Sequence, residues 1–215
     1  IRVRPQAAGG VTSAAMVRPG NPITRLLPLL TLALGVTASG CTNFTRQADG
    51  RVLAPRTGHS FTPSDFGLAF EAQQLKVADG VSLEVWWIPA PAGTQHQGDG
   101  GEDGAGGPGR TVLLCCPADA NIGDLSPWYR FLHEGGWNVV AWDPRGFGKS
   151  SGVPSMTATV RDVRRVARFA SETWRCPMDR LVTYGIGLGS GSATALLAGD
   201  RRVAAAVCDG VTSAA

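Results

Sequence analysis

Residues 111–208 alternate short apolar runs with segments of helical spacing, and this alternation most limits the folds open to the chain. Residues 111–116 are continuously apolar, which is typical of a strand buried on both faces of a parallel sheet. Similar runs recur at 137–142, 180–184 and 203–208. Strands and helices that alternate through short connections form a doubly wound, mostly parallel sheet. We therefore predict an α/β fold whose ligands lie beyond the carboxyl ends of the strands.

The expected helices lie between these runs. Ser126 and Pro127 predict a helix start, with Ser126 as N-cap and Pro127 at the first helical position, and Gly135-Gly136 predicts its end. Residues 157–174 carry one apolar stripe, while most of their arginines fall elsewhere and indicate a solvated helix face. Residues 188–198 predict a third helix.

Three further segments precede the alternating region. Residues 74–86 alternate apolar and polar side chains around Asp79-Gly80, which predicts a β-hairpin. Residues 93–109 contain eight glycines and no large apolar side chain, which predicts a flexible surface loop. Residues 42–66 are polar and are expected to form a tether to a domain at 67–215.

The first 41 residues are typical of an export signal. Arg18 and Arg25 flank the start of a short apolar run at 26–36, and Ala38-Ser39-Gly40 follows before Cys41. The run is shorter than the roughly 20 residues that span a bilayer. Ala-Ser-Gly-Cys resembles the bacterial lipobox, which implies lipidation at Cys41 and a protein anchored in the bacterial cell envelope, outside the cytoplasm. Met16 is the expected start of this signal, with residues 1–15 upstream.

Charge and cysteine content exclude several classes of function. From residue 42 onward, 16 basic side chains face 17 acidic ones, so the chain has no basic surface for nucleic acid. The cysteines show no metal-ligand spacing, and no cofactor is expected. Cys115, Cys116 and Cys208 stand in apolar runs, where buried thiols behave as small hydrophobes, although disulfides involving these or Cys176 stay open.

The segment 143–150, Asp-Pro-Arg-Gly-Phe-Gly-Lys-Ser, follows the second predicted parallel strand. Its Gly-Lys-Ser ending is not a P-loop, because the first glycine of that motif would fall on Asp143. The segment resembles the Asp-x-Arg-Gly-x-Gly-x-Ser signature of α/β-hydrolases. Together with the order of elements over about 66–215, it resembles the serine aminopeptidase and Bem46-like branch. The resemblance implies a serine hydrolase of ester or peptide bonds.

The same resemblance makes residues 183–191 the nucleophile elbow, a turn of the form Gly-x-Ser-x-Gly between a strand and a helix. Gly185 and Gly189 match the framing glycines, but Gly187 stands where the family has its serine. A glycine offers no oxygen, so acyl-enzyme chemistry cannot begin there. Ser190 and Ser192 fall inside the following helix and are poor substitutes. No catalytic residue is therefore assigned.

The oxyanion hole implied by the resemblance is altered as well. The candidate donors are the N–H groups of Leu188 and Ala118, but Pro117, which precedes Ala118, has no N–H. Cys116 is interpreted as a buried strand end rather than a nucleophile. No histidine follows Gly187, and Asp209 comes one strand too early for the acid of the family.

Three interpretations remain open. The chain is an exported, lipid-anchored hydrolase homologue that is catalytically inert and binds a small molecule or a protein. Alternatively, it is a truncated or altered copy of an active serine hydrolase. A third interpretation takes the glycines from Gly185 as a dinucleotide-binding turn with Asp209 on the ribose, but Ser190 replaces the third glycine of that fingerprint.

Overall fold

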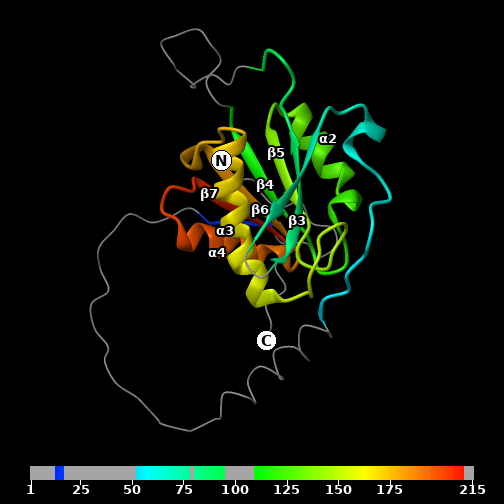
Figure 1. Cartoon of the computed structure of the whole chain (residues 1–215). Helices are drawn as coiled ribbons and strands as arrows, with labels where there is room; N and C mark the ends of the chain where they lie inside the picture. Colours follow the sequence, from blue (N-terminus) through cyan, green and yellow to red (C-terminus); the bar gives the residue numbers. More distant parts are fainter. Residues whose placement is uncertain (1–12, 17–51, 78–79, 95–108, 211–215) are drawn as a thin grey trace, which may run out of the picture.

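The computed structural model describes residues 13–16, 52–77, 80–94 and 109–210. They form one seven-stranded sheet in the order β1-β7-β6-β4-β5-β3-β2 (Figure 1). The strands are β1 (Ser13–Met16), β2 (Glu71–Lys76), β3 (Ser82–Ile88), β4 (Thr111–Cys115), β5 (Asn138–Trp142), β6 (Leu181–Ile186) and β7 (Ala205–Asp209). The helices are α2 (Ser126–Glu134), α3 (Met156–Thr173) and α4 (Gly189–Gly199), with short 3-10 turns η1 (Pro63–Phe66), η3 (Ile122–Asp124) and η4 (Met178–Arg180).

The centre of the sheet is parallel, as the sequence predicts. β4 pairs in parallel with β5 on one side and with β6 on the other, and β6 pairs in parallel with β7. β2 and β3 pair antiparallel, which confirms the predicted hairpin, and the Val77 N–H donates to the Val81 carbonyl beside its turn. The α/β fold class is therefore confirmed.

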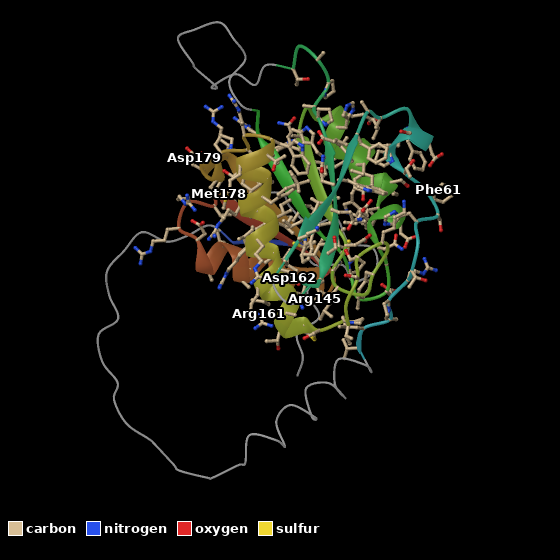
Figure 2. The ribbon with its side chains drawn as sticks, viewed as in Figure 1. Phe61, Arg145, Arg161, Asp162, Met178 and Asp179 are labelled. Atoms are coloured by element: carbon tan, nitrogen blue, oxygen red, sulfur yellow. The ribbon has the colours of Figure 1, made fainter. Side chains whose placement is uncertain are left out.

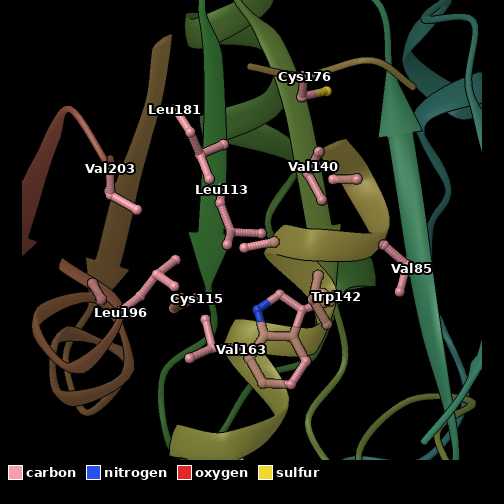
Figure 3. Packing of buried hydrophobic residues seen from close by; sticks show 14 of the residues in the cluster. Val85, Leu113, Cys115, Val140, Trp142, Val163, Cys176, Leu181, Leu196 and Val203 are labelled. Atoms are coloured by element: carbon pink, nitrogen blue, oxygen red, sulfur yellow. The ribbon is translucent and has the colours of Figure 1, made fainter. Parts of the chain in front are cut away.

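Helices cover the two faces of the sheet, α2 on one and α3 with α4 on the other (Figure 1). The alternation of side chains along each strand divides the core accordingly. Leu113 and Val140 pack with Val163 of α3 and Leu196 of α4, as Figure 3 shows. Leu114 and its neighbours on the other face pack against α2. Since both faces of β4 are covered, all five of its residues are buried.

The start of α2 differs from the prediction. Ser126 is the first helical residue, Leu125 holds the N-cap position, and no side chain caps the helix. The reason is that η3 runs directly into α2 through Leu125, so the capping side chain stands earlier: Asn121 accepts from the Gly123 N–H at 2.8 Å. The predicted end is confirmed, since Gly136 adopts a left-handed φ of 79°.

The outer edge of β7 is paired with β1, which runs antiparallel to it from Ser13 to Met16. These residues were expected to lie upstream of the folded domain. Cys41, the apolar run at 26–36 and most of the glycine-rich loop lie outside the described residues. Of the helices described, none has the length and apolar character needed to span a membrane.

Candidate functional site

The turn at Gly187 joins β6 to α4 through a left-handed backbone conformation that glycine adopts without strain. Gly187 has φ 52°, the left-handed region that side chains other than glycine enter at a cost. Its N–H donates to the Asp209 carbonyl at 2.7 Å, and its carbonyl accepts from the Ser190 N–H at 3.1 Å. The Asp209 carboxylate accepts from the Tyr184 hydroxyl at 3.0 Å. Asp209 therefore holds the turn in place, and the strand–turn–helix shape of a nucleophile elbow is present without a nucleophile.

The three glycines of this turn are needed for different reasons. A Cβ on Gly185 would lie 2.4 Å from the Ser190 Cα, and one on Gly189 would lie 2.2 Å from the Cys115 carbonyl oxygen. Both positions therefore require glycine so that α4 can pack against the strands. A Cβ on Gly187 would meet only the Pro117 Cβ, at an ordinary 3.6 Å. The nucleophile position has room for a side chain.

A cavity of about 110 Å³ lies beside the elbow, at the carboxyl ends of the strands. Its walls come from five segments and are mostly apolar. The lining residues that matter below are Leu53, Ala118, Phe147, Met156, Leu188 and Ser192. The position is the one that a doubly wound sheet offers to ligands.

Both candidate oxyanion donors line this cavity. Leu188 is the N-cap residue of α4, and neither its N–H nor that of Ala118 has a hydrogen-bond acceptor among the described residues. The Ala118 carbonyl accepts from the Ala54 N–H at 2.8 Å. Two residues whose N–H groups have no acceptor among the described residues therefore line an apolar cavity, an arrangement that suits a ligand with a carbonyl or carboxylate oxygen.

The other candidate nucleophiles are not activated. Burial raises the pKa of the Cys116 thiol well above its ordinary value, so this sulfur stays protonated, and it lies 3.5 Å from the Trp142 carbonyl oxygen. The Ser190 hydroxyl donates to the Gly185 carbonyl at 3.1 Å. Ser192 lines the cavity, but no histidine or carboxylate among the described residues hydrogen-bonds its hydroxyl. Among the described residues, none hydrogen-bonds any of these three groups as the base that nucleophilic catalysis requires.

Asp143, the first residue of the signature segment after β5, forms a buried side-chain pair with His59 that the sequence did not predict. The Asp143 carboxylate contacts the His59 Nε2 at 2.6 Å, and the two side chains are 0% and 2% exposed. Asp143 also accepts from the Ile122 N–H at 2.9 Å. A Cβ on Gly148 would lie 1.7 Å from this carboxylate, so the second glycine of the signature makes room for the pair. The His59 ring packs edge-on against Trp86.

The remaining signature residues attach this loop to its neighbours. Arg145 donates to Asp162 of α3 from Nε at 2.6 Å and from a terminal nitrogen at 3.2 Å. Figure 2 shows the two side chains together at the lower end of α3. The Ser150 hydroxyl donates to the Asp143 carbonyl at 2.7 Å and accepts from the Glu84 N–H at 2.9 Å. The loop therefore has a structural role in shaping the cavity, to which Phe147 contributes a wall.

His59 belongs to a segment that we call the strap, residues 52–62. The sequence suggests a polar tether here, but the strap is fixed to the domain. The Gly58 N–H donates to the Gly148 carbonyl at 2.8 Å, and the Gly148 N–H donates to the Arg56 carbonyl at 2.7 Å. Asn121 adds a bond from its side-chain amide to the Gly58 carbonyl at 2.6 Å. The strap thereby places Leu53 in the cavity wall.

Comparisons with known proteins agree with this architecture. The family model described as serine aminopeptidase, S33, matches residues 108–214. Protein bem46 of Schizosaccharomyces pombe is 29% identical over 139 residues, covering 64% of this chain and 42% of that protein. The membrane protein YNL320W of Saccharomyces cerevisiae is 29% identical over 159 residues, covering 71% and 48%. Protein YfhR of Escherichia coli O157:H7 is 29% identical over 135 residues, covering 61% and 43%.

Solved structures show the same fold. The Pyrococcus furiosus esterase Pf2001 superposes with a TM-score of 0.54 at 20% identity, over 71% of this chain and 54% of the esterase. An α/β-hydrolase from Vibrio vulnificus gives a TM-score of 0.54 at 15% identity, over 75% and 53%. The chain spans about half the length of the curated relatives it matches. By family model, relatives and fold, the chain belongs to the α/β-hydrolase superfamily, in its Bem46-like branch.

Proposed function

We propose that this chain is an exported, lipid-anchored α/β-hydrolase-family protein that binds a ligand beside the elbow without hydrolysing it. The observation that carries the proposal is Gly187, which holds the backbone shape of the elbow without a side chain. Serine hydrolases form an acyl-enzyme through an oxygen at this point, and glycine has none. The proposed lack of hydrolytic activity therefore rests on Gly187 alone, in a turn that otherwise has the shape of a nucleophile elbow.

Binding is supported by the parts of the site that persist. The cavity, the Leu188 N–H and the Ala118 N–H are all in place, and none of them depends on a nucleophile. An apolar cavity with two N–H donors at one edge suits a ligand with a short acyl group and a carbonyl or carboxylate oxygen. This is the ligand class that we propose.

The envelope location is supported by the expected signal that begins at Met16 and by its lipobox-like end at Cys41. A matched relative named as a membrane protein is consistent with it. Expression of the full chain with radiolabelled palmitate in a bacterial host tests the anchor directly. We expect label on the full chain and none on Cys41→Ser. Label that persists in Cys41→Ser would overturn the anchor.

Hydrolysis and binding are tested on the same full-length protein. With p-nitrophenyl butyrate, we expect no release of p-nitrophenol above the rate without protein. Butyrate is expected to raise the melting temperature. It should not do so in Gly191→Leu, because Gly191 lines the cavity and a Cβ there meets no atom within 4 Å, so the leucine fits and fills the space. Saturable hydrolysis that Gly191→Leu abolishes would contradict the proposal.

A second candidate function is favoured by the open space at Gly187, because an altered copy of an active hydrolase would keep room for its serine. A Cβ at this position would meet only the Pro117 Cβ, at 3.6 Å. Labelling of the Gly187→Ser variant by a fluorophosphonate probe, in a chain that is otherwise unlabelled, would support this candidate. We expect no labelling, since no described histidine hydrogen-bonds a group at the elbow.

A further inference from the structure

Three of the five large apolar side chains exposed on the described part of the chain stand on segments next to the cavity, while Phe61 and Phe131 do not line it. Among the large apolar residues exposed on the described part of the chain, Val52, Val153 and Met156 are 48%, 74% and 40% accessible. Val52 directly precedes Leu53, a cavity wall, and Met156 is itself a cavity wall. Val153 stands three residues before Met156. We call these three residues the apolar rim.

The rim is carried on fixed backbone. The Ser151 N–H donates to the Ser82 carbonyl at 2.9 Å, and the Gly146 N–H donates to the Ser151 carbonyl at 3.2 Å, so the segment that leads to Val153 is bonded on both sides. After it, the Ser155 side chain caps α3 by accepting from the Ala158 N–H. Pro154, which follows Val153, lies beside Gly146, between the cavity residues Pro144 and Phe147. Single exposed apolar residues are ordinary, but three carried on bonded segments that border one cavity indicate an interaction surface.

The strap, the described segment that follows Cys41 in the sequence, lies at this same edge. The strap begins at Val52, and the Ala54 N–H bond to the Ala118 carbonyl fixes it beside the cavity. Eleven residue steps separate Cys41 from Val52, which span about 40 Å at most when fully extended. A domain of about 150 residues has a radius of gyration of roughly 15 Å, so its diameter is close to that limit. A tether that attaches at this edge and reaches no further than about one domain diameter favours orientations in which the rim faces the bilayer.

We propose that the apolar rim is a membrane-docking surface, whose partner is the lipid bilayer and whose contact points the cavity mouth at the lipid phase. The inference rests on the proposed anchor at Cys41. Apolar side chains that enter the acyl boundary stabilise such contacts, while cations stay at the headgroups. Lys149 and Arg161, both exposed, flank the segment 153–156 in the sequence and suit that role. Asp119 is also exposed on this side, so the apolar contact carries the attraction.

The test uses the protein as a bacterial host processes it, purified and reconstituted into vesicles of phosphatidylethanolamine and phosphatidylglycerol that contain doxyl-labelled lipid. A fluorophore is attached at Val153→Cys or at Phe131→Cys. Phe131 is the matched control, because it is 73% exposed on α2 and does not line the cavity. The chain without an introduced cysteine gives the background. We expect about threefold or greater quenching at 153 relative to 131, since only the rim enters the acyl boundary.

The outcomes separate this surface from the anchor. Equal quenching at 153 and 131, or stronger quenching at 131, would overturn the docking surface even when palmitate labelling confirms the anchor. Quenching confined to 153 in a chain that takes no palmitate label would support the surface and remove the anchor instead.

Discussion

At the scale of single residues, the three glycines of the elbow look alike in the sequence but differ in the structure. The sequence could assign Gly185 and Gly189 to a motif, yet it could not show that their missing side chains make room for α4. It could not show either that Gly187 faces open space. Such distances depend on how a helix packs on a strand, which no local pattern contains.

This difference predicts the stability of alanine variants. Gly187→Ala is expected to lower the free energy of unfolding by about 1 kcal/mol, the cost of a left-handed φ for a residue with a Cβ. Gly189→Ala is expected to cost about 3 kcal/mol or more, because its Cβ would overlap the Cys115 carbonyl. Urea denaturation of the full chain measures both. An equal fall in the free energy of unfolding of the two variants would show that the room for a Cβ does not differ between these positions.

The buried cysteines give a prediction about pH. Burial raises the pKa of the Cys115 thiol from 9.0 to about 11. Below pH 9 this thiol is protonated whether the chain is folded or unfolded, so its contribution to stability is complete. Between pH 9 and about 11 only the unfolded chain releases the proton, so the free energy of unfolding falls. Melting temperatures of the full chain and of Cys115→Ala across this range check it. The melting temperature should fall less in Cys115→Ala than in the full chain as the pH rises. An equal fall in both would contradict the raised pKa of the Cys115 thiol.

At the scale of elements, the sequence predicts the strands and helices well and the strap poorly. Periodicity marks elements that bury one face, and it placed β4, β5, β6, α3 and α4 within a few residues. The strap has no such face. It is held by backbone bonds to Gly148 and by His59, which lies 84 positions from Asp143, and a contact of that span leaves no local pattern. The burial of Asp162 could have been predicted from the sequence. Asp162 lies four residues from both Ala158 and Val166, so it falls on the buried stripe of α3. A buried carboxylate needs a cation beside it, and Arg145 is that cation.

The strap is expected to depend on the His59 and Asp143 pair. Removing one partner of a buried pair leaves the other without compensation, at a cost of about 3–5 kcal/mol. In His59→Ala, hydrogen exchange at the Gly58 and Gly148 amides should therefore accelerate at least tenfold, while the amides of β4 change less. His133→Ala, in the last turn of α2, is the control and should leave both amides as they are. Unchanged protection at Gly58 in His59→Ala would show that the backbone bonds alone hold the strap.

At the scale of the whole molecule, the alternating pattern was sufficient to predict the α/β fold, and the signature at 143–150 was sufficient to predict the family. The edge of the sheet was not predicted. β1 pairs along the outer edge of β7, and the sequence at 13–16 is too short to mark a strand by its own pattern. A four-residue strand is positioned by its partner rather than by its own sequence.

The pairing of β1 with β7 predicts how the oligomeric state depends on residues 1–40. Their removal, as in cleavage before Cys41, leaves the β7 edge with unpaired N–H and C=O groups, and such edges promote association between chains. We expect residues 42–215 to associate or precipitate where the full chain stays monomeric in light scattering. A sharp, cooperative melt of a monomeric 42–215 fragment would contradict this.

Intact-mass spectrometry of the full chain after incubation with a fluorophosphonate probe tests the inert elbow most directly. We predict a single species at the mass of the unmodified protein, because Gly187 offers no oxygen to phosphorus and no base among the described residues hydrogen-bonds Ser190 or Ser192. A stoichiometric adduct on any residue that lines the cavity would show that a nucleophile is present and that the chain is an enzyme.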